Sequence, residues 1–127
     1  MTLRALVVDD SRAMRGILRR ILNERGIAVV EAANGRQALE LLQAGEQVQI
    51  ALVDWNMPEM TGYEFVCAVR RVPAWNSMPI MMVTTEAEIE QMTRALEAGA
   101  NEYVMKPFTS DVIAGKLELL GFEATAA

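Results

Sequence analysis

The chain has 127 residues, a formal net charge of −5 and 52% apolar residues, a size that suits one domain with one core. With no histidine and one cysteine, it excludes serine–histidine catalysis, histidine metal sites, internal disulfides and cysteine zinc sites. An acidic balance without a recognisable reading motif argues against nucleic-acid binding, and no apolar run approaches the roughly 18 residues of a membrane span.

Short apolar runs alternate with amphipathic segments along the chain. The first run, Leu3 to Val8, is rich in branched residues and predicts a strand buried on both faces. Ser11 can cap the helix that follows, whose apolar residues recur with a helical period until Gly26 ends it. Ile27 to Glu31 predicts a second strand, and Asn34-Gly35 predicts a turn before a second helix.

The second half of the chain repeats this alternation. Ile50 to Val53 predicts a third strand, followed by a polar loop through Gly62 and a helix that must end before Pro73, because proline disfavours a helical predecessor. The remaining elements are expected, in order, as strand 80–83, helix 86–98, strand 102–105 and helix 110–120. Five strands alternating with five helices predict an α/β fold, a doubly wound parallel sheet covered on both faces.

Polar residues follow four of the expected strands. In chain order they are Asp9 and Asp10, Asp54 and Asn56, Thr84 and Thr85, and Lys106-Pro107. The carboxyl ends of parallel strands meet at one edge of the sheet, where such folds bind their ligands. Each residue alone is explained as well by a helix cap or a turn, but their joint placement favours a functional site. Glycine-rich phosphate motifs are absent from the sequence, so nucleotide binding of those kinds is not expected.

Three aspartates at one edge repel one another, and a hard divalent cation relieves the repulsion. We expect Mg²⁺, or else Mn²⁺, on oxygen ligands: Asp10 and Asp54 directly, Asp9 through water, and the Asn56 carbonyl. A carboxylate that faces a metal and a lysine is suited to attack phosphorus, which makes Asp54 the candidate nucleophile. The Lys106 ammonium and the Thr84 hydroxyl would each meet a phosphoryl oxygen.

The chain resembles the receiver domain of response regulators in bacterial two-component signalling, and within that family the chemotaxis type. The likeness covers essentially the whole chain, and the segments that carry it are Val8-Asp9-Asp10-Ser11, Asp54-Trp55-Asn56-Met57-Pro58 with Gly62, Val83-Thr84-Thr85-Glu86-Ala87, and Tyr103-Val104-Met105-Lys106-Pro107-Phe108. This resemblance implies a flavodoxin-like sheet of strand order 2-1-3-4-5 and a single receiver domain, residues 1–127, without an output domain. It also implies a cis peptide between Lys106 and Pro107.

The resemblance assigns a role to each residue of the site. It implies that Asp54 is the phosphoacceptor, that Lys106 pairs with the phosphoryl group, and that Asp9, Asp10 and the Asn56 carbonyl serve Mg²⁺. Thr84 and Tyr103 would form the switch. Asn56 and Glu86 would tune dephosphorylation.

The resemblance further implies a signalling switch that is not a turnover enzyme. A histidine kinase would donate the phosphoryl group, a phosphatase could remove it, and the face of the fourth helix, fifth strand and fifth helix would bind a protein target such as the flagellar motor switch. Such a protein would be a cytoplasmic monomer with no nucleic-acid partner and no membrane insertion. The N-terminal residues, which lack the pattern of a secretion signal, agree with this location.

Other interpretations keep part of this chemistry. The chain would be a phosphorelay receiver, the receiver part of a longer regulator, or a phosphatase with an aspartyl-phosphate intermediate. Phosphatases similar to this site carry a second acid where this chain has Asn56, which cannot donate a proton in the same way. Arg12, Arg15 and Arg19 form a stripe on the first helix, which we interpret as a solvated face in preference to a kinase-docking surface.

Overall fold

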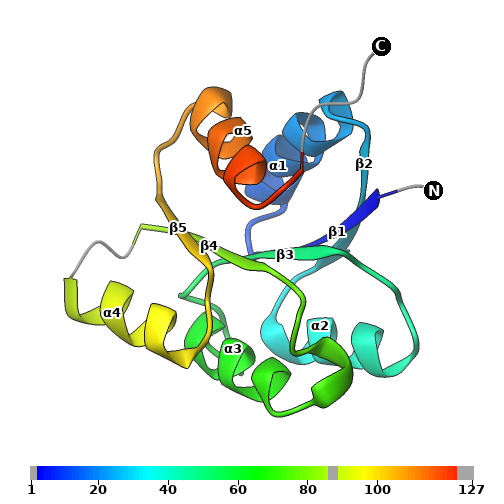
Figure 1. Ribbon diagram of the computed structural model, residues 1–127, viewed down its shortest axis with the longest axis vertical. Helices are drawn as coiled ribbons and strands as arrows, with labels where there is room; N and C mark the ends of the chain where they lie inside the picture. The colour runs from blue at the N-terminus through cyan, green and yellow to red at the C-terminus, as the bar shows by residue number, and fades with distance from the viewer. Residues whose placement is uncertain (1–2, 86–88, 123–127) are drawn as a thin grey trace.

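The computed structural model describes residues 3–85 and 89–122, which form a parallel sheet between two layers of helices (Figure 1). The strands are β1 (Leu3–Val8), β2 (Ile27–Ala32), β3 (Ile50–Val53), β4 (Ile80–Thr84) and β5 (Glu102–Met105). The helices are α1 (Arg12–Glu24), α2 (Gly35–Gln43), α3 (Gly62–Arg70), α4 (Ile89–Ala98) and α5 (Ser110–Leu119), with a 3₁₀ turn η1 (Pro73–Trp75). The strand order β2-β1-β3-β4-β5 confirms the expected fold.

Helices α1 and α5 cover one face of the sheet, and α2, α3 and α4 cover the other (Figure 1). Successive residues of a strand point to opposite faces, so Ala5 and Val7 of β1 pack under α1 and α5, whereas Leu6 and Val8 pack under the other three helices. Both faces of the central strands are therefore buried, which explains why these strands are continuous apolar runs. Among the described helices, none has the length and hydrophobicity to cross a bilayer.

Most expected boundaries agree with the structure to within one residue, and two differ in kind. Asn34-Gly35 is not a turn, because Asn34 caps α2 by accepting the Gln37 amide at 2.8 Å and Gly35 is already helical. Gly62 does not end the loop after β3 but begins α3, because Thr61 before it forms a capping box. The Asn-Gly pair is a signal for both structures, and the capping hydrogen bond decides between them.

The C-terminal end of α4 is held by Arg70, from the end of α3. Its guanidinium donates to the Gly99 carbonyl at 2.9 and 3.1 Å and to the Asn101 side-chain oxygen at 3.0 Å. Gly99 has a φ of +121°, and a Cβ there would lie 2.8 Å from the Arg70 side chain, so both backbone and space require glycine. The C-terminal end of α4 is thus anchored. The expected start of this helix at Glu86 lies outside the described residues.

Candidate functional site

The polar residues of the expected site lie directly after their strands, and the hydrogen bonding of the sheet continues into them. The Asp9 amide donates to the Ala32 carbonyl at 3.1 Å, and the Asp54 amide donates to the Val8 carbonyl at 3.0 Å. At the other side of the sheet the Lys106 amide donates to the last residue of β4 at 2.9 Å. The backbone at these positions is therefore held by the same ladder that holds the strands.

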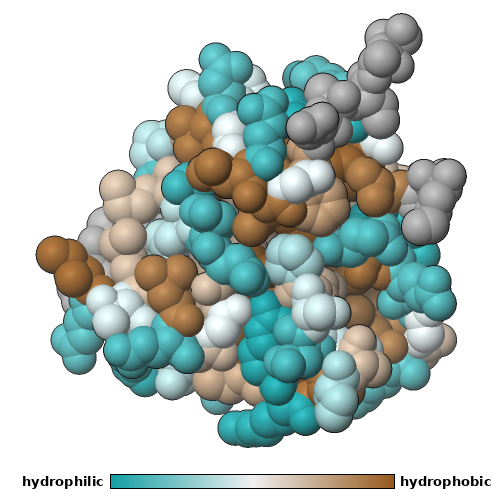
Figure 2. All heavy atoms as spheres, viewed as in Figure 1, coloured by the Kyte–Doolittle hydropathy of each residue, from teal (hydrophilic) through white to brown (hydrophobic). Residues whose placement is uncertain are grey.

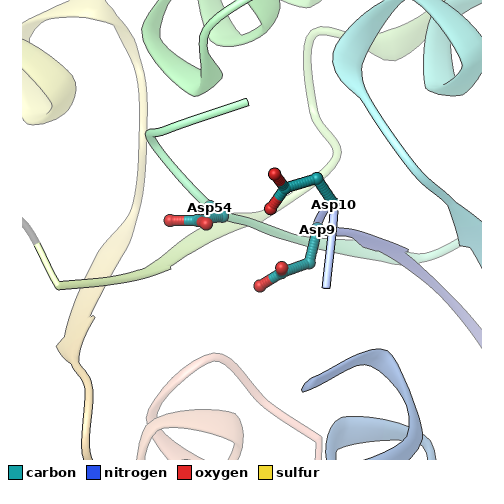
Figure 3. A group of neighbouring side chains, drawn as sticks. All are labelled: Asp9, Asp10 and Asp54. Atoms are coloured by element: carbon teal, nitrogen blue, oxygen red, sulfur yellow. The ribbon is translucent and has the colours of Figure 1, made fainter. Parts of the chain in front are cut away.

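Three carboxylates meet at this edge of the sheet. Asp9, Asp10 and Asp54 each offer one oxygen, and these oxygens lie within 4.8 Å of one another (Figure 3). The first two residues follow β1 and the third follows β3, and these strands are neighbours in the sheet. Asp9 and Asp54 are buried whereas Asp10 is exposed, so the cluster is open to solvent on the Asp10 side.

Lys106 brings a positive charge into this cluster. Its Nζ lies 2.7 Å from Asp9 Oδ2 and 3.4 Å from Asp54 Oδ2, and its side chain is largely buried. The other Asp9 oxygen accepts the Ser11 amide at 2.8 Å. Three carboxylates and one ammonium leave a formal charge of −3 + 1 = −2, which a divalent cation would neutralise.

Asp54 lies in an environment that favours its protonated form. Burial raises the pKa of the Asp54 carboxyl, and the charge of Asp9 acts in the same direction. A hydrogen bond from the Thr84 hydroxyl and the charge of Lys106 oppose this rise. A cation bound beside Asp54 would further stabilise the carboxylate that a nucleophile needs.

The donor set at this edge fits Mg²⁺. All available ligands are oxygens, which suits a hard cation that is commonly held by one or two carboxylates and keeps several waters. Asp10 is exposed and Asp54 faces it, whereas both oxygens of Asp9 already accept hydrogen bonds. This difference makes the Asp10 carboxylate the more accessible of the two ligands that follow β1.

The remaining expected residues occupy different positions around the cluster. Asn56 is exposed on the loop after β3, Thr84 is fully buried at the end of β4, and Tyr103 on β5 packs half-buried against the core cluster under α3 and α4. The Lys106–Pro107 peptide bond is cis, as the resemblance implied. Glu86 lies outside the described residues.

Gly62 and Tyr63 also shape the site, although the sequence predicted a functional role for neither. A Cβ on Gly62 would lie 2.2 Å from the carbonyl oxygen of Asp54, so only glycine lets α3 begin this close to the loop. The Trp55 ring stacks on Tyr63 with 5.5 Å between centroids, and the Arg94 guanidinium lies 4.7 Å from the Tyr63 centroid. The sequence pointed to Gly62 only through its place in the motif that begins at Asp54, and no sequence pattern indicated the contact between Trp55 and Tyr63.

The expected solvated stripe on α1 is wrong for one of its residues. The Arg15 side chain is only 15% exposed, and it binds both Glu31 at 2.9 Å and the Asp9 carbonyl at 2.7 Å. Arg19 is 45% exposed and also binds Glu31, whereas Arg12 is exposed. The periodicity of α1 does not indicate the burial of Arg15, because its partner Glu31 lies on β2.

Comparison with known proteins adds to this geometry. The family model of the response regulator receiver domain matches residues 5–118. The chain is 46% identical over 117 residues to a chemotaxis protein CheY homolog of Campylobacter jejuni, covering 91% of this chain and 90% of that protein. It is 42% identical over 119 residues to chemotaxis protein CheY1 of Helicobacter pylori, covering 93% and 96%. The solved structure of chemotaxis protein CheY4 of Vibrio cholerae is similar with a TM-score of 0.87 at 35% identity, covering 94% and 98%.

Proposed function

Because the chain belongs to the family of response regulator receiver domains, we propose that it is switched by a phosphoryl group that Asp54 accepts from a histidine kinase. As a receiver domain it is a signalling switch and not a turnover enzyme. The observation that carries the assignment to Asp54 is its buried carboxylate, which lies beside two further aspartates with the Lys106 ammonium 3.4 Å away.

The chemistry at Asp54 is the transfer of a phosphoryl group from a nitrogen or oxygen atom of the donor to a carboxylate oxygen. A carboxylate oxygen of Asp54 forms the new P–O bond while the bond from phosphorus to the donor breaks, and the product is an aspartyl phosphate. Positioning and charge neutralisation supply most of the catalysis in such a transfer. Lys106 pairs with one phosphoryl oxygen, and the Thr84 hydroxyl, which donates to the Asp54 carboxylate before transfer, donates to another.

The cation completes the neutralisation of charge. Asp10, Asp54 and the Asn56 carbonyl would hold Mg²⁺, with Asp9 acting through water, and Mn²⁺ could replace it. When bound, the ion offsets the charge that the phosphoryl oxygens bring into an already acidic edge. The acidic triad is typical of the Mg²⁺ site of receiver domains.

Phosphorylation changes the balance of contacts around Thr84. The modification adds about −1.5 to −2 charges, and it draws the Thr84 hydroxyl and Lys106 away from their present carboxylate partners. Tyr103, half-buried on the neighbouring strand, turns towards the space that Thr84 leaves. Because Arg70 anchors the C-terminal end of α4, the conformational change on phosphorylation occurs at the N-terminal end of α4 and in β5.

The surface of α4, β5 and α5 is suited to binding a target. Exposed large hydrophobic residues on these elements are Ile89, Leu96, Met105, Val112 and Leu119. Figure 2 shows hydrophobic side chains gathered over α5 and further groups over α4. An exposed apolar face beside a switching strand is what a protein partner would cover. The names of the chemotaxis relatives support a role in chemotaxis signalling. We extend the proposal to the flagellar motor switch as the partner, to a role in the cytoplasm, and to a single-domain, monomeric receiver.

The proposed target face has a direct test. The phosphorylated protein should bind the purified motor switch protein more tightly than the unphosphorylated form, and Val112→Glu on α5 should weaken that binding. Ile17→Glu, which places the same charge on an exposed hydrophobic residue of α1, is the matched control and should leave binding unchanged. Equal loss in both variants would show that this face is not the specific contact.

The phosphoacceptor assignment is tested separately. The protein is incubated with Mg²⁺ and a small acyl phosphate, and the intact mass is measured. We expect one phosphoryl adduct in the wild type, none after removal of Mg²⁺ by a chelator, and none in Asp54→Asn. An adduct that is independent of Mg²⁺ would argue against the acidic cluster as its site.

A further inference from the structure

We propose that Arg15 is a positioning residue of the metal site, which fixes the peptide between Asp9 and Asp10 and thereby raises the affinity of Asp10 for Mg²⁺. This inference rests on the proposed function, because it concerns the cation that phosphoryl transfer needs. It goes beyond that function in assigning a role to a residue that belongs neither to the acidic cluster nor to its immediate loop.

Arg15 connects the end of β1 to β2. It lies in the first turn of α1, and its Nη1 donates to the Asp9 carbonyl oxygen at 2.7 Å. Its Nε donates to Oε1 of Glu31 at 2.9 Å. Hydrogen bonds from a charged guanidinium are short and strong, and this one is largely shielded from solvent. The guanidinium therefore holds the Asp9 carbonyl in one orientation.

The orientation of that carbonyl matters because of the residue that follows it. The Asp9 carbonyl belongs to the planar peptide that carries the amide of Asp10, so fixing the oxygen also fixes the start of Asp10. The Asp9 side chain has its own partners in Lys106 and the Ser11 amide. Within residues 3–85 and 89–122, the exposed Asp10 carboxylate has no hydrogen bond of its own. Its direction thus depends on its backbone, which Arg15 holds.

Glu31 holds Arg15 in turn, and it remains ionised while doing so. Burial works to raise the pKa of Glu31, but the hydrogen bonds and charges of Arg19 and Arg15 together bring it below its ordinary value. Arg19 binds the second oxygen of Glu31 at 2.7 Å. Within the described part of the chain, Arg19 makes no hydrogen bond to the loop after β1. The two arginines share a partner, and only Arg15 reaches the metal site.

Charge and position predict opposite effects of Arg15 on cation binding. A positive charge near three carboxylates repels Mg²⁺, so loss of the charge alone would tighten binding. Loss of an outer contact that orients a ligand weakens metal binding, typically by tenfold or more. The sign of the change therefore separates a positioning residue from a charge that only lies nearby.

The experiment is a Mg²⁺ titration followed by Trp55 fluorescence. A Trp75→Phe background leaves Trp55, which is buried next to Asp54, as the sole tryptophan. Arg15→Gln should weaken Mg²⁺ binding by roughly tenfold. Arg15→Lys, which keeps the charge but cannot reach both partners with a rigid fork, should fall between this variant and the wild type. Arg19→Gln, the matched control, should bind within about twofold of the wild type.

A double-mutant cycle tests whether Arg15 acts through Asp10. In an Asp10→Asn background, Arg15→Gln should cause little further loss of Mg²⁺ affinity, since the ligand that it orients is already changed. A general structural defect would weaken binding equally in both backgrounds. Urea denaturation confirms that each variant is folded, and if Arg15→Gln does not fold, the cycle is run with Arg15→Lys.

Three outcomes would overturn the inference. The first is that Arg15→Gln, or Arg15→Lys where that variant replaces it, binds Mg²⁺ as tightly as the wild type or more tightly. The second is that Arg19→Gln loses as much Mg²⁺ affinity as the Arg15 variant. The third is that the Arg15 substitution causes the same loss of Mg²⁺ affinity in the Asp10→Asn background as in the wild type. A wild-type protein that binds no Mg²⁺ would instead overturn the proposed function. The two failures are thus distinguishable.

Discussion

Replacement of Gly62 by alanine should damage both the stability of the fold and the chemistry at Asp54. The added Cβ would lie 2.2 Å from the Asp54 carbonyl oxygen and 2.9 Å from the Trp55 Cα, whereas ordinary contact begins at 3.4 Å. Both neighbours are backbone, so no flexible side chain can yield. The loop and the start of α3 must therefore separate by about 1 Å, a displacement of the size that lowers enzymatic rates about 100-fold. Overpacking of this kind costs about 1–3 kcal/mol of folding free energy.

Two measurements check this prediction. Urea denaturation gives the loss of folding free energy in Gly62→Ala, and intact mass gives its rate of phosphorylation by a small acyl phosphate. The control is Gly115→Ala in α5, where a Cβ would meet no atom within 4 Å. The control should be more stable by about 0.5–1 kcal/mol, because alanine suits a helix better than glycine, and its phosphorylation rate should not change. Wild-type stability and rate in Gly62→Ala would refute the reasoning.

The other predictions concern the charges and the switch. In metal-free solution at neutral pH, Asp54→Asn should be more stable than the wild type, because burial raises the Asp54 pKa and the fold thus disfavours the ionised form. As the pH falls through that raised pKa the wild type regains its proton, so thermal denaturation should show the difference shrinking, and a constant difference would contradict the cause. Lys106→Met should destabilise the metal-free protein by about 3 kcal/mol, because two buried carboxylates lose the ammonium at 2.7 and 3.4 Å. Mg²⁺ should restore more stability to this variant than to the wild type, and equal restoration in urea denaturation would weigh against the charge balance. Thr84→Val should still accept the phosphoryl group but lose most of the change in hydrogen exchange of β5, and a wild-type response would remove Thr84 from the switch.

The acidic cluster could be predicted from the sequence because its residues follow strands directly. Asp9 and Asp54 each stand next to a strand that ends in a continuous buried apolar run, Lys106 follows the more mixed strand Glu102–Met105, and a parallel sheet brings such positions to one edge. Periodicity does not say which strands pair, so the strand order came from the family resemblance. The same local signals were ambiguous at Asn34, where an Asn-Gly pair suits both a turn and a helix cap.

The contacts that support the cluster could not be predicted in this way, because they join distant segments. Arg15 was interpreted as solvated since the pattern of α1 does not reveal that β2 places Glu31 opposite it. The need for glycine at position 62 depends on how closely α3 approaches the Asp54 carbonyl, a distance that no local pattern contains. Sequence patterns therefore located the reacting groups, whereas packing between elements identified the residues that hold them.

Chemical localisation of the phosphoryl group tests the central claim most directly. The protein is phosphorylated with Mg²⁺ and a small acyl phosphate, then reduced with borohydride, which converts an aspartyl phosphate to homoserine, and its peptides are mapped by mass. Modification at Asp54 alone is the predicted result. Modification at Asp9 or Asp10, or no modified aspartate in a protein that carries the adduct, would contradict the account.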